Sequence, residues 1–296
     1  MNGQKQKLVV ILTFFLVTGC TNPSAMEKEE EFYRLYDSIL GLPSGSYSLE
    51  LPVTDTAEWT ERPMLAKDVY LVRSKNQIEP LIVVDGEIVD VSSFKDVMVA
   101  WRLDCWEADY PLLTCRLNID KSQKMKDLDE LKKVLADIGI KRIQYAVVPK
   151  NDKVKIIDYP FVSFHPMWIQ PRFYGDSIYQ MLLERACSIP NQISVIQTGV
   201  DRYEINGISV SGADCKSVFM GLIQQDLDYI IRFKVTDDMT FADYMLVLTS
   251  AWEVVQELKE EYAIEKYSKH LDQVFSDEEE LDLRNHFPFR FFEEKE

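Results

Sequence analysis

The chain has 296 residues, of which 46% are hydrophobic and 28% charged, with only 11 Gly and 12 Pro. This composition excludes a collagen-like, low-complexity or wholly disordered protein, and the length is enough for two domains of ordinary size. The net charge of −16 argues against nucleic-acid binding, because phosphates would be repelled over most of the surface. With only three histidines, a His-rich metal site is nearly excluded.

The first 20 residues have the pattern of a bacterial lipoprotein signal. Two lysines precede an apolar run from Leu8 to Val17, which is too short to span a bilayer, since a spanning helix needs about 20 residues. The run leads into Thr18-Gly19-Cys20, a sequence typical of a lipobox. We therefore expect a signal peptide over 1–19 and acyl chains such as palmitate on Cys20. This address is the cell envelope, on the periplasmic side of the outer membrane. The alternative is a plain signal peptide or a stub helix with an incidental cysteine.

Residues 20–65 are predicted to form a tether and an N-terminal segment. A cluster of glutamates leads into Phe32, Leu35, Tyr36 and Ile39, whose spacing predicts a short amphipathic helix. The sequence Gly41 to Gly45 is expected to end it, because it combines Gly, Pro and Ser. The glutamates are interpreted as a solvated helix face.

Two stretches of the chain repeat each other at an offset of 121 residues. In each, a two-residue turn separates two apolar runs: Asp85-Gly86 in the first copy and Asn206-Gly207 in the second. These dipeptides are strong signals for type I′ hairpin turns, which need positive φ at both positions. A helix is predicted after each hairpin, with Asp90 and Ser211 as the N-cap residues.

A buried strand and a second helix are predicted after each of these helices. The strands are 112–120 and 229–237, ending in Asp120 and Asp237. A closing strand over 142–148 is expected in the first copy only, because the last helix of the second copy continues without a Gly break to about Tyr267. The fold class is therefore α+β, with two tandem two-layer units, each a small mixed sheet with two helices on one face. We assign repeat 1 to residues 66–150 and repeat 2 to residues 191–270.

Residues 151–190 are an aromatic connector with several prolines, and a helix is predicted over 176–187. The aromatic side chains either form a ligand platform or, as we favour, pin the connector into an interdomain core. Residues 271–296 are an acidic and aromatic tail, interpreted as a cover over a sheet edge, with partner recognition as the alternative.

No strong catalytic motif is present, and the chain is predicted to be neither an enzyme nor a cofactor or metal binder. The glycines around Ser209 lack the spacing of a nucleophile elbow, the histidines are scattered, and there is no P-loop. Asp120 and Asp237 end strands, where a site could lie. Turn capping is the interpretation we prefer for both.

Four cysteines remain after Cys20, and an even number in an oxidising compartment permits disulfides. Cys105 and Cys115 are the candidate pair, because a short loop joins them. Packed thiols are the alternative for Cys115 and Cys215, which fall on apolar faces.

Three segments resemble the periplasmic domain of the ExbD/TolR family. They are the hairpin sequence 204–210, the strand-to-helix junction 235–244, and the extended Leu51-Pro52-Val53. The resemblance implies small α/β units that pair as dimers in the envelope. The chain differs from the family in that a lipidated Cys20 stands in place of the transmembrane helix and its acidic residue.

These observations predict a non-enzymatic envelope lipoprotein, anchored to the membrane by its lipid, that acts as an accessory or scaffold, for example in transport. Its partner would be another envelope protein or cell-wall peptidoglycan. The two copies are expected to form an intrachain pseudo-dimer, with the aromatic residues around Trp168 at the contact. The alternative is a solute-binding or hydrolytic lipoprotein that uses the cleft between the repeats.

Overall fold

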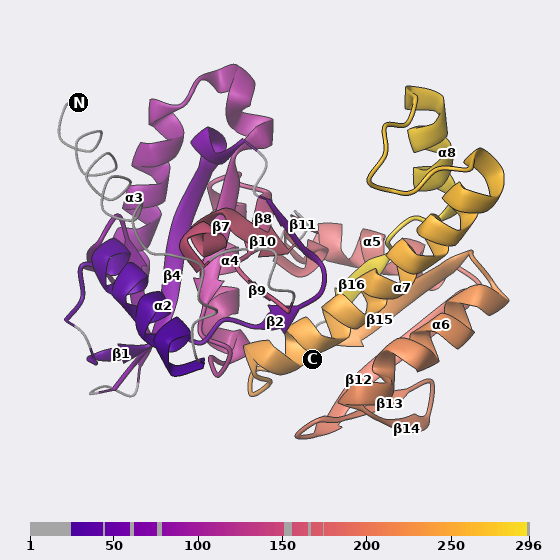
Figure 1. The fold of residues 1–296 in the computed structure, drawn as a ribbon, viewed down its shortest axis with the longest axis horizontal. Coiled ribbons are helices and arrows are strands. Elements are labelled where there is room, and N and C mark those ends of the chain that lie inside the picture. Colours follow the sequence, from indigo (N-terminus) through magenta and orange to yellow (C-terminus); the bar gives the residue numbers. More distant parts are fainter. Residues whose placement is uncertain are drawn as a thin grey trace.

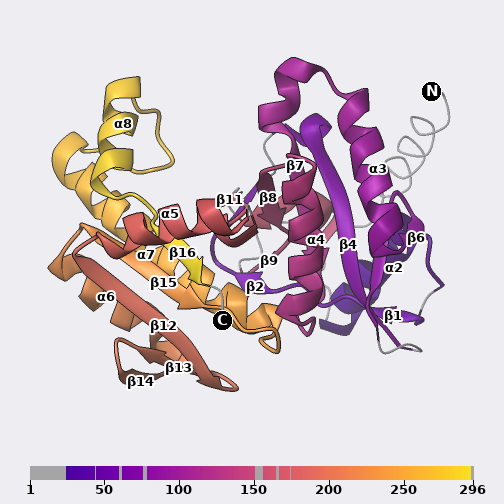
Figure 2. The ribbon, with the colours of Figure 1, turned by 180° about the vertical axis from the view of Figure 1, so that it is seen from behind.

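The computed structural model describes residues 25–43, 45–59, 62–75, 79–150, 156–164, 167–173 and 175–294. Two α/β lobes lie side by side, the N-terminal one in indigo to magenta and the C-terminal one in orange to yellow (Figure 1). We call them unit 1 (β4 to β8) and unit 2 (β12 to β16). The architecture is α+β, as predicted, with helices α3 and α4 on one face of the first sheet and α6 and α7 on one face of the second (Figure 2).

Unit 1 is built on a sheet with the strand order β11-β8-β7-β4-β5-β6. Strand β7 pairs in parallel with both β4 and β8, whereas β5 pairs antiparallel with β4 and β6. Its elements in chain order are β4 (Ala66–Ser74), β5 (Leu81–Val84), β6 (Glu87–Val89), α3 (Val91–Asp104), β7 (Thr114–Ile119), α4 (Met125–Asp137) and β8 (Arg142–Tyr145). Short β1 (Tyr47–Ser48) and β11 (Met167–Trp168) extend this sheet.

Unit 2 repeats this connectivity in the order β14-β13-β12-β15-β16. Its elements are β12 (Asn191–Gly199), β13 (Arg202–Ile205), β14 (Ile208–Ser211), α6 (Cys215–Gln225), β15 (Tyr229–Lys234), α7 (Phe241–Tyr267), α8 (Asp277–His286) and β16 (Phe291–Glu294). The expectation that this copy lacks a closing strand is wrong. The tail supplies β16, which pairs in parallel with β15 and covers its edge.

The predicted turn chemistry explains both hairpins. Asp85 and Gly86 have φ of 55° and 81°, and Asn206 and Gly207 have φ of 49° and 80°, as a type I′ turn requires. Asp90 caps α3 by accepting a hydrogen bond from the Ser93 N–H at 2.7 Å.

Ser211 does not cap α6 as expected. A single 3₁₀ turn, Gly212–Asp214, intervenes before that helix, and the Ser211 hydroxyl donates to Asp214 at 2.5 Å. The side chain is therefore engaged with the turn instead of with the helix N-terminus.

The two units meet through equivalent segments, and their hydrogen bonds come in symmetric pairs. Met125 N–H donates to Met239 O at 2.9 Å, and Phe241 N–H donates to Gln123 O at 2.8 Å. Both donors are the first residues of the second helix in their unit, and Lys124 and Thr240, the two N-caps, pair with each other in an antiparallel bridge. A pseudo-two-fold axis therefore passes between these two residues.

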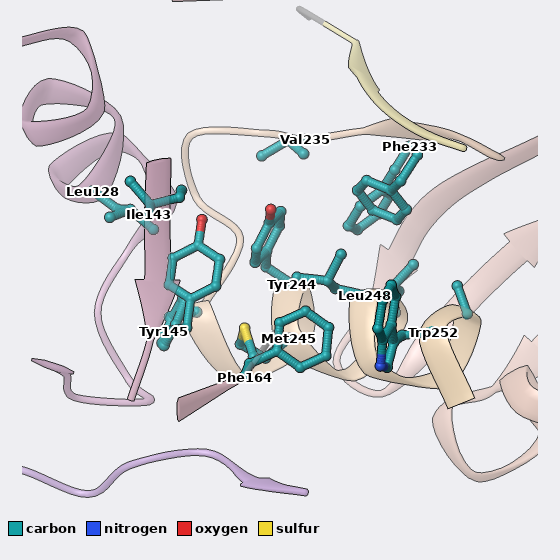
Figure 3. Close-up of a cluster of buried hydrophobic side chains, with 14 of the residues drawn as sticks. Leu128, Ile143, Tyr145, Phe164, Phe233, Val235, Tyr244, Met245, Leu248 and Trp252 are labelled. Atoms are coloured by element: carbon teal, nitrogen blue, oxygen red, sulfur yellow. The ribbon is translucent and has the colours of Figure 1, made fainter. Parts of the chain in front are cut away.

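One apolar core extends through both units. Tyr145 of β8 packs against Phe241 and Tyr244 of α7, with ring centroids 5.2 and 5.9 Å apart (Figure 3). From the connector, Phe164 of β10 (Val162–Phe164) packs edge-to-face on Trp252. We expect the aromatic residues around Trp168 at the contact, and Phe164 lies there, whereas Trp168 itself is 61% exposed.

The outer faces of the two sheets, opposite these helices, are covered differently. Helix α2 (Ala25–Leu40) and the segment after it cover unit 1 and place Tyr36 and Leu40 on Tyr70 and Val83. Helix α5 (Asp176–Cys187) packs on Ile230 and Phe292 of unit 2. The remaining short strands are β2 (Val53–Thr54) with β9 (Val148–Pro149), and β3 (Ala57–Trp59) with β10.

Candidate functional site

A cavity of about 380 Å³ lies where the parallel strands β4 and β7 end and α4 begins. The carboxyl ends of parallel strands are where open α/β sheets commonly place ligands. Its charged lining comprises three cations and two acids: Arg73, Lys124, Lys126, Glu79 and Asp127. The cations are in excess here although the chain as a whole carries a net charge of −16.

Asp120 shapes the loop that forms one wall of this cavity. Its Oδ1 accepts hydrogen bonds from the Ser122 N–H at 3.0 Å and hydroxyl at 2.5 Å, and its Oδ2 accepts from the Glu50 N–H at 2.8 Å. The side chain is 2% exposed. Asp120 is therefore a turn-organising residue, which is the interpretation preferred from the sequence.

Opposing effects act on the pKa of Asp127 in the cavity. Burial raises this pKa, and the negative charge of Glu79 raises it further. The positive charge of Lys126 and a hydrogen bond from the backbone of Lys124 lower it and partly offset the rise. Lys124 Nζ donates to the Asp238 carbonyl at 2.6 Å, so this cation also ties the cavity wall to unit 2. The lining therefore carries cations in small excess over acids, with one of the cations held by a backbone carbonyl.

The cavity has no catalytic arrangement among its lining residues. The lining contains neither His nor Cys, and its serines, Ser74 and Ser122, have no imidazole base beside them. Among the described residues, no cluster of three or more His, Cys, Asp or Glu side chains could hold a metal ion.

A second polar group lies on the outer face of the unit 1 sheet, beneath α2. The strand register puts Asp68, Arg116 and Gln144 in one row across β4, β7 and β8. Arg116 is 3% exposed, and its Nε donates to Asp68 Oδ1 at 2.5 Å. In the next row, Asn118 Nδ2 also donates to Asp68 Oδ1, at 3.3 Å.

Three buried polar atoms of the described residues, on this sheet face and on α2 above it, lack hydrogen-bond partners. They are Asn118 Oδ1, Gln144 Oε1 and Tyr36 Oη. Burial raises the pKa of Tyr36 far above its usual range, so the phenol stays neutral. Buried polar atoms without hydrogen-bond partners lower the stability of the fold, and ordered water molecules would supply the missing hydrogen bonds.

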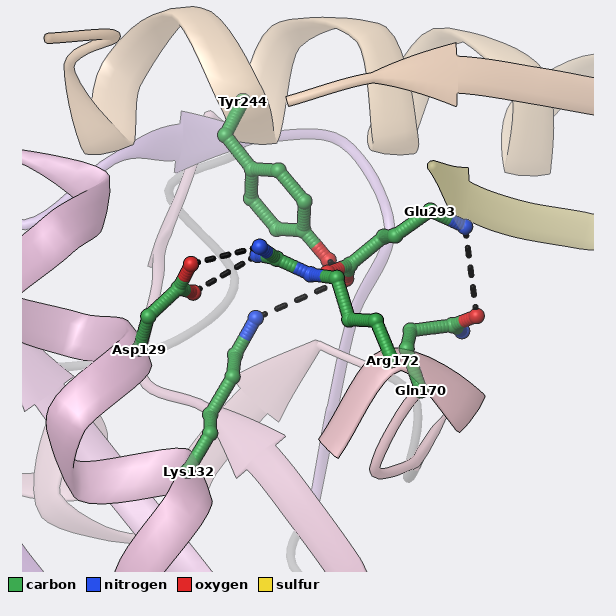
Figure 4. A network of polar contacts seen from close by, with 6 residues as sticks. All are labelled: Asp129, Lys132, Gln170, Arg172, Tyr244 and Glu293. Carbon is green, nitrogen blue, oxygen red and sulfur yellow. Dashed lines mark hydrogen bonds and ion pairs between the residues drawn. The ribbon is translucent and has the colours of Figure 1, made fainter. Parts of the chain in front are cut away.

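A third polar cluster lies at the junction of the two units (Figure 4). Lys132 of α4 and Glu293 of β16 are both 0% exposed, and Lys132 Nζ lies 3.5 Å from Glu293 Oε1. Glu293 also accepts hydrogen bonds from Arg172 Nε and Tyr244 Oη, each at 2.7 Å. Arg172 continues the network to Asp129 at 2.6 Å.

The charges at the junction stabilise each other against burial. Burial alone would lower the pKa of Lys132, but Glu293, Tyr145 and Asp129 outweigh it and raise that pKa. Burial would raise the pKa of Glu293, but Lys132 and Arg172 outweigh it and lower that pKa. All of these polar groups are used within the chain, so the cluster holds the units together and is not a ligand site.

The residues singled out from the sequence do not form a common site. Cys20 lies outside the described residues. The turn residues Asp85, Gly86, Asn206 and Gly207 are on two separate hairpins. Asp237 is exposed, and its carbonyl accepts from the Lys126 N–H at 3.3 Å.

The disulfide considered for Cys105 and Cys115 is not formed, and both are free thiols. Cys115 is buried in the core beneath the helices, where burial raises the pKa of its thiol beyond the usual range. Cys105 instead caps the end of α3, with its Sγ 3.4 Å from Trp101 O.

The cavity residues Arg73, Glu79, Lys126 and Asp127 were missed by the sequence analysis. The signal was available, because Val69 to Val72 is an apolar run like the other strands. Recognising it as a strand parallel to 112–120 would have pointed to the loops that follow both.

Comparison of the chain with protein-family models, with curated proteins and with solved structures found no match. Within the described part of the chain, no helix has both the length and the apolar character needed to cross a membrane. The functional conclusion therefore rests on the sequence and on the geometry above.

Proposed function

We propose that the chain is a non-enzymatic lipoprotein of the bacterial envelope that binds another envelope protein or cell-wall material as an accessory or scaffold. The lipobox ending at Cys20 supports the address, and the motifs resembling ExbD/TolR support the envelope role. Pairing of the two units inside one chain supports a soluble part that is monomeric, because equivalent surfaces already contact each other.

The observation that carries the binding role is the outer face of unit 2. In unit 1, α2 covers β4 and β5. In unit 2, α5 packs on β15 and β16, while four outward residues of β12 and β13 are exposed: Ser194, Thr198, Arg202 and Glu204. At the edge of this sheet, Ser209 of β14 is exposed and shares the outer face with its register partner Glu204, whereas the exposed Ile208 pairs with Ile205 on the helix side. A polar sheet face with an open edge strand is suited to a protein partner that adds a strand or lies across the face.

A matched pair of variants tests this surface. Ser209→Asp puts a charge on the outer face at the edge of unit 2, where Ser209 is exposed and pairs with Glu204. Ile88→Asp makes the same change at the equivalent outward position of unit 1, where Ile88 pairs with Val83 and is 56% exposed. After crosslinking in intact cells, we expect one partner band to be lost from the Ser209 variant and kept by the Ile88 variant. Identical partner bands for both variants and the wild type would refute a unit 2 docking face.

The anchor is tested separately. Replacement of Cys20 by Ala is expected to release the protein from membranes, because the acyl chains on this cysteine are the only anchor that the lipobox provides. The readout is membrane fractionation together with the mass lost on deacylation of the wild type. Continued membrane association of the variant, with no acyl mass on the wild type, would contradict it.

Solute binding is the second candidate, and the cavity at the start of α4 supports it. The described residues between the units are packed core and ion pairs, so this cavity suits a solute better than the junction does. The probe is a panel of small organic and inorganic anions in thermal-shift assays. Solute binding would be supported if an anion raises the melting temperature of the wild type and of Lys133→Glu, an exposed control on α4, but not that of Lys126→Glu. No rise with any anion would count against it.

A further inference from the structure

The pseudo-two-fold axis makes it possible to ask which residues occupy equivalent places at the junction. Lys124 and Thr240 are the equivalent N-caps that pair across the axis. Lys132 stands eight residues after Lys124, and Leu248 stands eight residues after Thr240. Lys132 and Leu248 therefore occupy the same position on the second helix of each unit.

The closing strands give the second equivalent pair. Tyr145 of β8 lies opposite Leu117, and Glu293 of β16 lies opposite Phe233. Leu117 and Phe233 are themselves equivalent, because each pairs with the core valine of the first strand in its own unit. Tyr145 and Glu293 therefore occupy the same position.

The pseudo-two-fold axis therefore relates two halves of the junction, and the side chains at equivalent positions in these halves differ in chemistry. In one half, Lys132 faces Glu293, with Nζ and Oε1 3.5 Å apart and both side chains fully buried (Figure 4). In the related half, the symmetry places Leu248 toward Tyr145, and both are buried in the shared core. One half contains an ion pair, and the other is uncharged, with the unpartnered Tyr145 hydroxyl as its polar atom.

We propose that this asymmetry specifies the pairing of unit 1 with unit 2 and excludes pairing of either unit with a second copy of itself. Two copies of unit 1 would place Lys132 opposite Tyr145 twice, with no carboxylate from the closing strand. Two copies of unit 2 would place Glu293 opposite Leu248 twice, so Glu293 would lose Lys132 and keep only Arg172 and the Tyr244 hydroxyl. A buried charge that has lost its partner is strongly destabilising, so only the mixed pair satisfies both charges.

The test uses the full mature chain with Lys132→Leu and Glu293→Tyr. These two substitutions give the ionic half the same residues, Leu and Tyr, that the related half has. With both halves uncharged, unit 1 can pair with unit 1 of another chain. Lys124→Cys reports this event, because position 124 lies on the axis and meets position 124 of a second chain only in such a pair. The two cysteines would then be close enough to form a disulfide.

Because the tether still favours the intrachain pair, we expect Lys124→Cys in the double-variant background to give a disulfide-linked dimer whose fraction rises with protein concentration. We expect none in the wild-type background, where this residue faces Thr240. The readouts are sedimentation velocity, non-reducing electrophoresis and mass spectrometry of the linked peptide, which also excludes the native cysteines. Lys150→Leu with Asp55→Tyr makes the same chemical change at an exposed ion pair and should leave the chain monomeric.

A milder variant guards against misfolding of the double variant. Lys132→Met with Glu293→Gln removes the same two charges and nearly preserves the side-chain shapes, and the same disulfide is expected from it. If either variant folds cooperatively, as judged by circular dichroism, and stays monomeric without the 124–124 link, the proposal is overturned.

Discussion

Units 1 and 2 share one topology, but different segments cover the outer faces of their sheets, and the equivalent arginine on each face has different partners. The strand register makes Arg116 and Arg232 equivalent, yet Arg116 pairs with Asp68 of its own sheet beneath α2, whereas Arg232 pairs with Gln192 and Glu294. Gln144 in unit 1 corresponds to Phe292 in unit 2, which stacks on Tyr179 of α5 at 5.8 Å. The difference shows that the covering segment, and not the strand topology, determines how much of this face is buried: α2 buries the central strands of unit 1, whereas α5 packs on β15 and β16 only and leaves β12 and β13 exposed.

The junction gives the same lesson on the inner side. Equivalent positions hold an ion pair in one half and uncharged side chains in the other. A duplicated fold can therefore become a single, directional assembly through a few substitutions at its axis, and four predictions test this comparison of the units.

The largest effect is expected from Glu293→Lys at the junction. The new cation would face Lys132 and Arg172 in a fully buried place, so the free energy of unfolding should fall by about 3–5 kcal/mol. Asp55→Lys, which sets two cations at the exposed pair with Lys150, is the matched control and should cost less than about 1 kcal/mol. Urea denaturation monitored by tryptophan fluorescence measures both, and similar small losses would show that the units do not depend on this network.

The two hairpin turns should respond equally. Gly86 and Gly207 have φ of 81° and 80°, so Gly86→Ala and Gly207→Ala should each lower the free energy of unfolding by about 1–2 kcal/mol through backbone strain. A new Cβ at Gly86 would meet nothing closer than 3.7 Å and one at Gly207 nothing within 4 Å, so packing should add little. Thermal unfolding of the two variants provides the measurement, and a loss at one turn alone would break the equivalence.

Tyr36 of α2 and Tyr47 of β1 should differ, although both are buried. Tyr47 Oη donates to Asp37 at 2.8 Å, so Tyr47→Phe should cost about 1 kcal/mol. Tyr36 Oη has no partner, so Tyr36→Phe should be neutral or stabilising. Chemical denaturation of the two variants decides this, and an equal loss in both would mean that a bound water or ligand satisfies Tyr36.

The smallest effect concerns pH and the contact of α8 with α7. Hydrogen bonds from Tyr267 and Lys266 lower the pKa of Asp282 from 3.8 to about 2. A lowered pKa means that the ionised form stabilises the folded state above about pH 4 and that this contribution disappears as the pH falls toward 2. Hydrogen exchange of the α8 amides should accelerate over that interval in the wild type but not in Asp282→Asn, and parallel profiles would refute the link.

Local signals in the sequence predicted much of each unit. The dipeptides Asp85-Gly86 and Asn206-Gly207 determine their turns through backbone geometry alone, and α5 spans the predicted residues 176–187. Such features depend on neighbours in the chain, and so they can be read from it.

Long-range features could not be predicted in the same way. The closing strand of unit 2 comes from Phe291–Glu294, which follows a 27-residue helix and a further helix. The pairing of Lys132 with Glu293 joins residues 161 positions apart, and nothing near either residue indicates its partner. The cavity at the start of α4 likewise depends on β4 and β7 being parallel neighbours.

The central claim is that the two units pair with each other inside one chain about an axis between Lys124 and Thr240. The most direct test combines Lys124→Cys with Thr240→Cys in the mature chain, mixed as isotope-labelled and unlabelled protein before oxidation. Mass spectrometry of the linked peptides should find positions 124 and 240 joined within single chains, in a protein that sediments as a monomer. Mixed-label linked peptides, or no link between these positions in the folded protein, would contradict it.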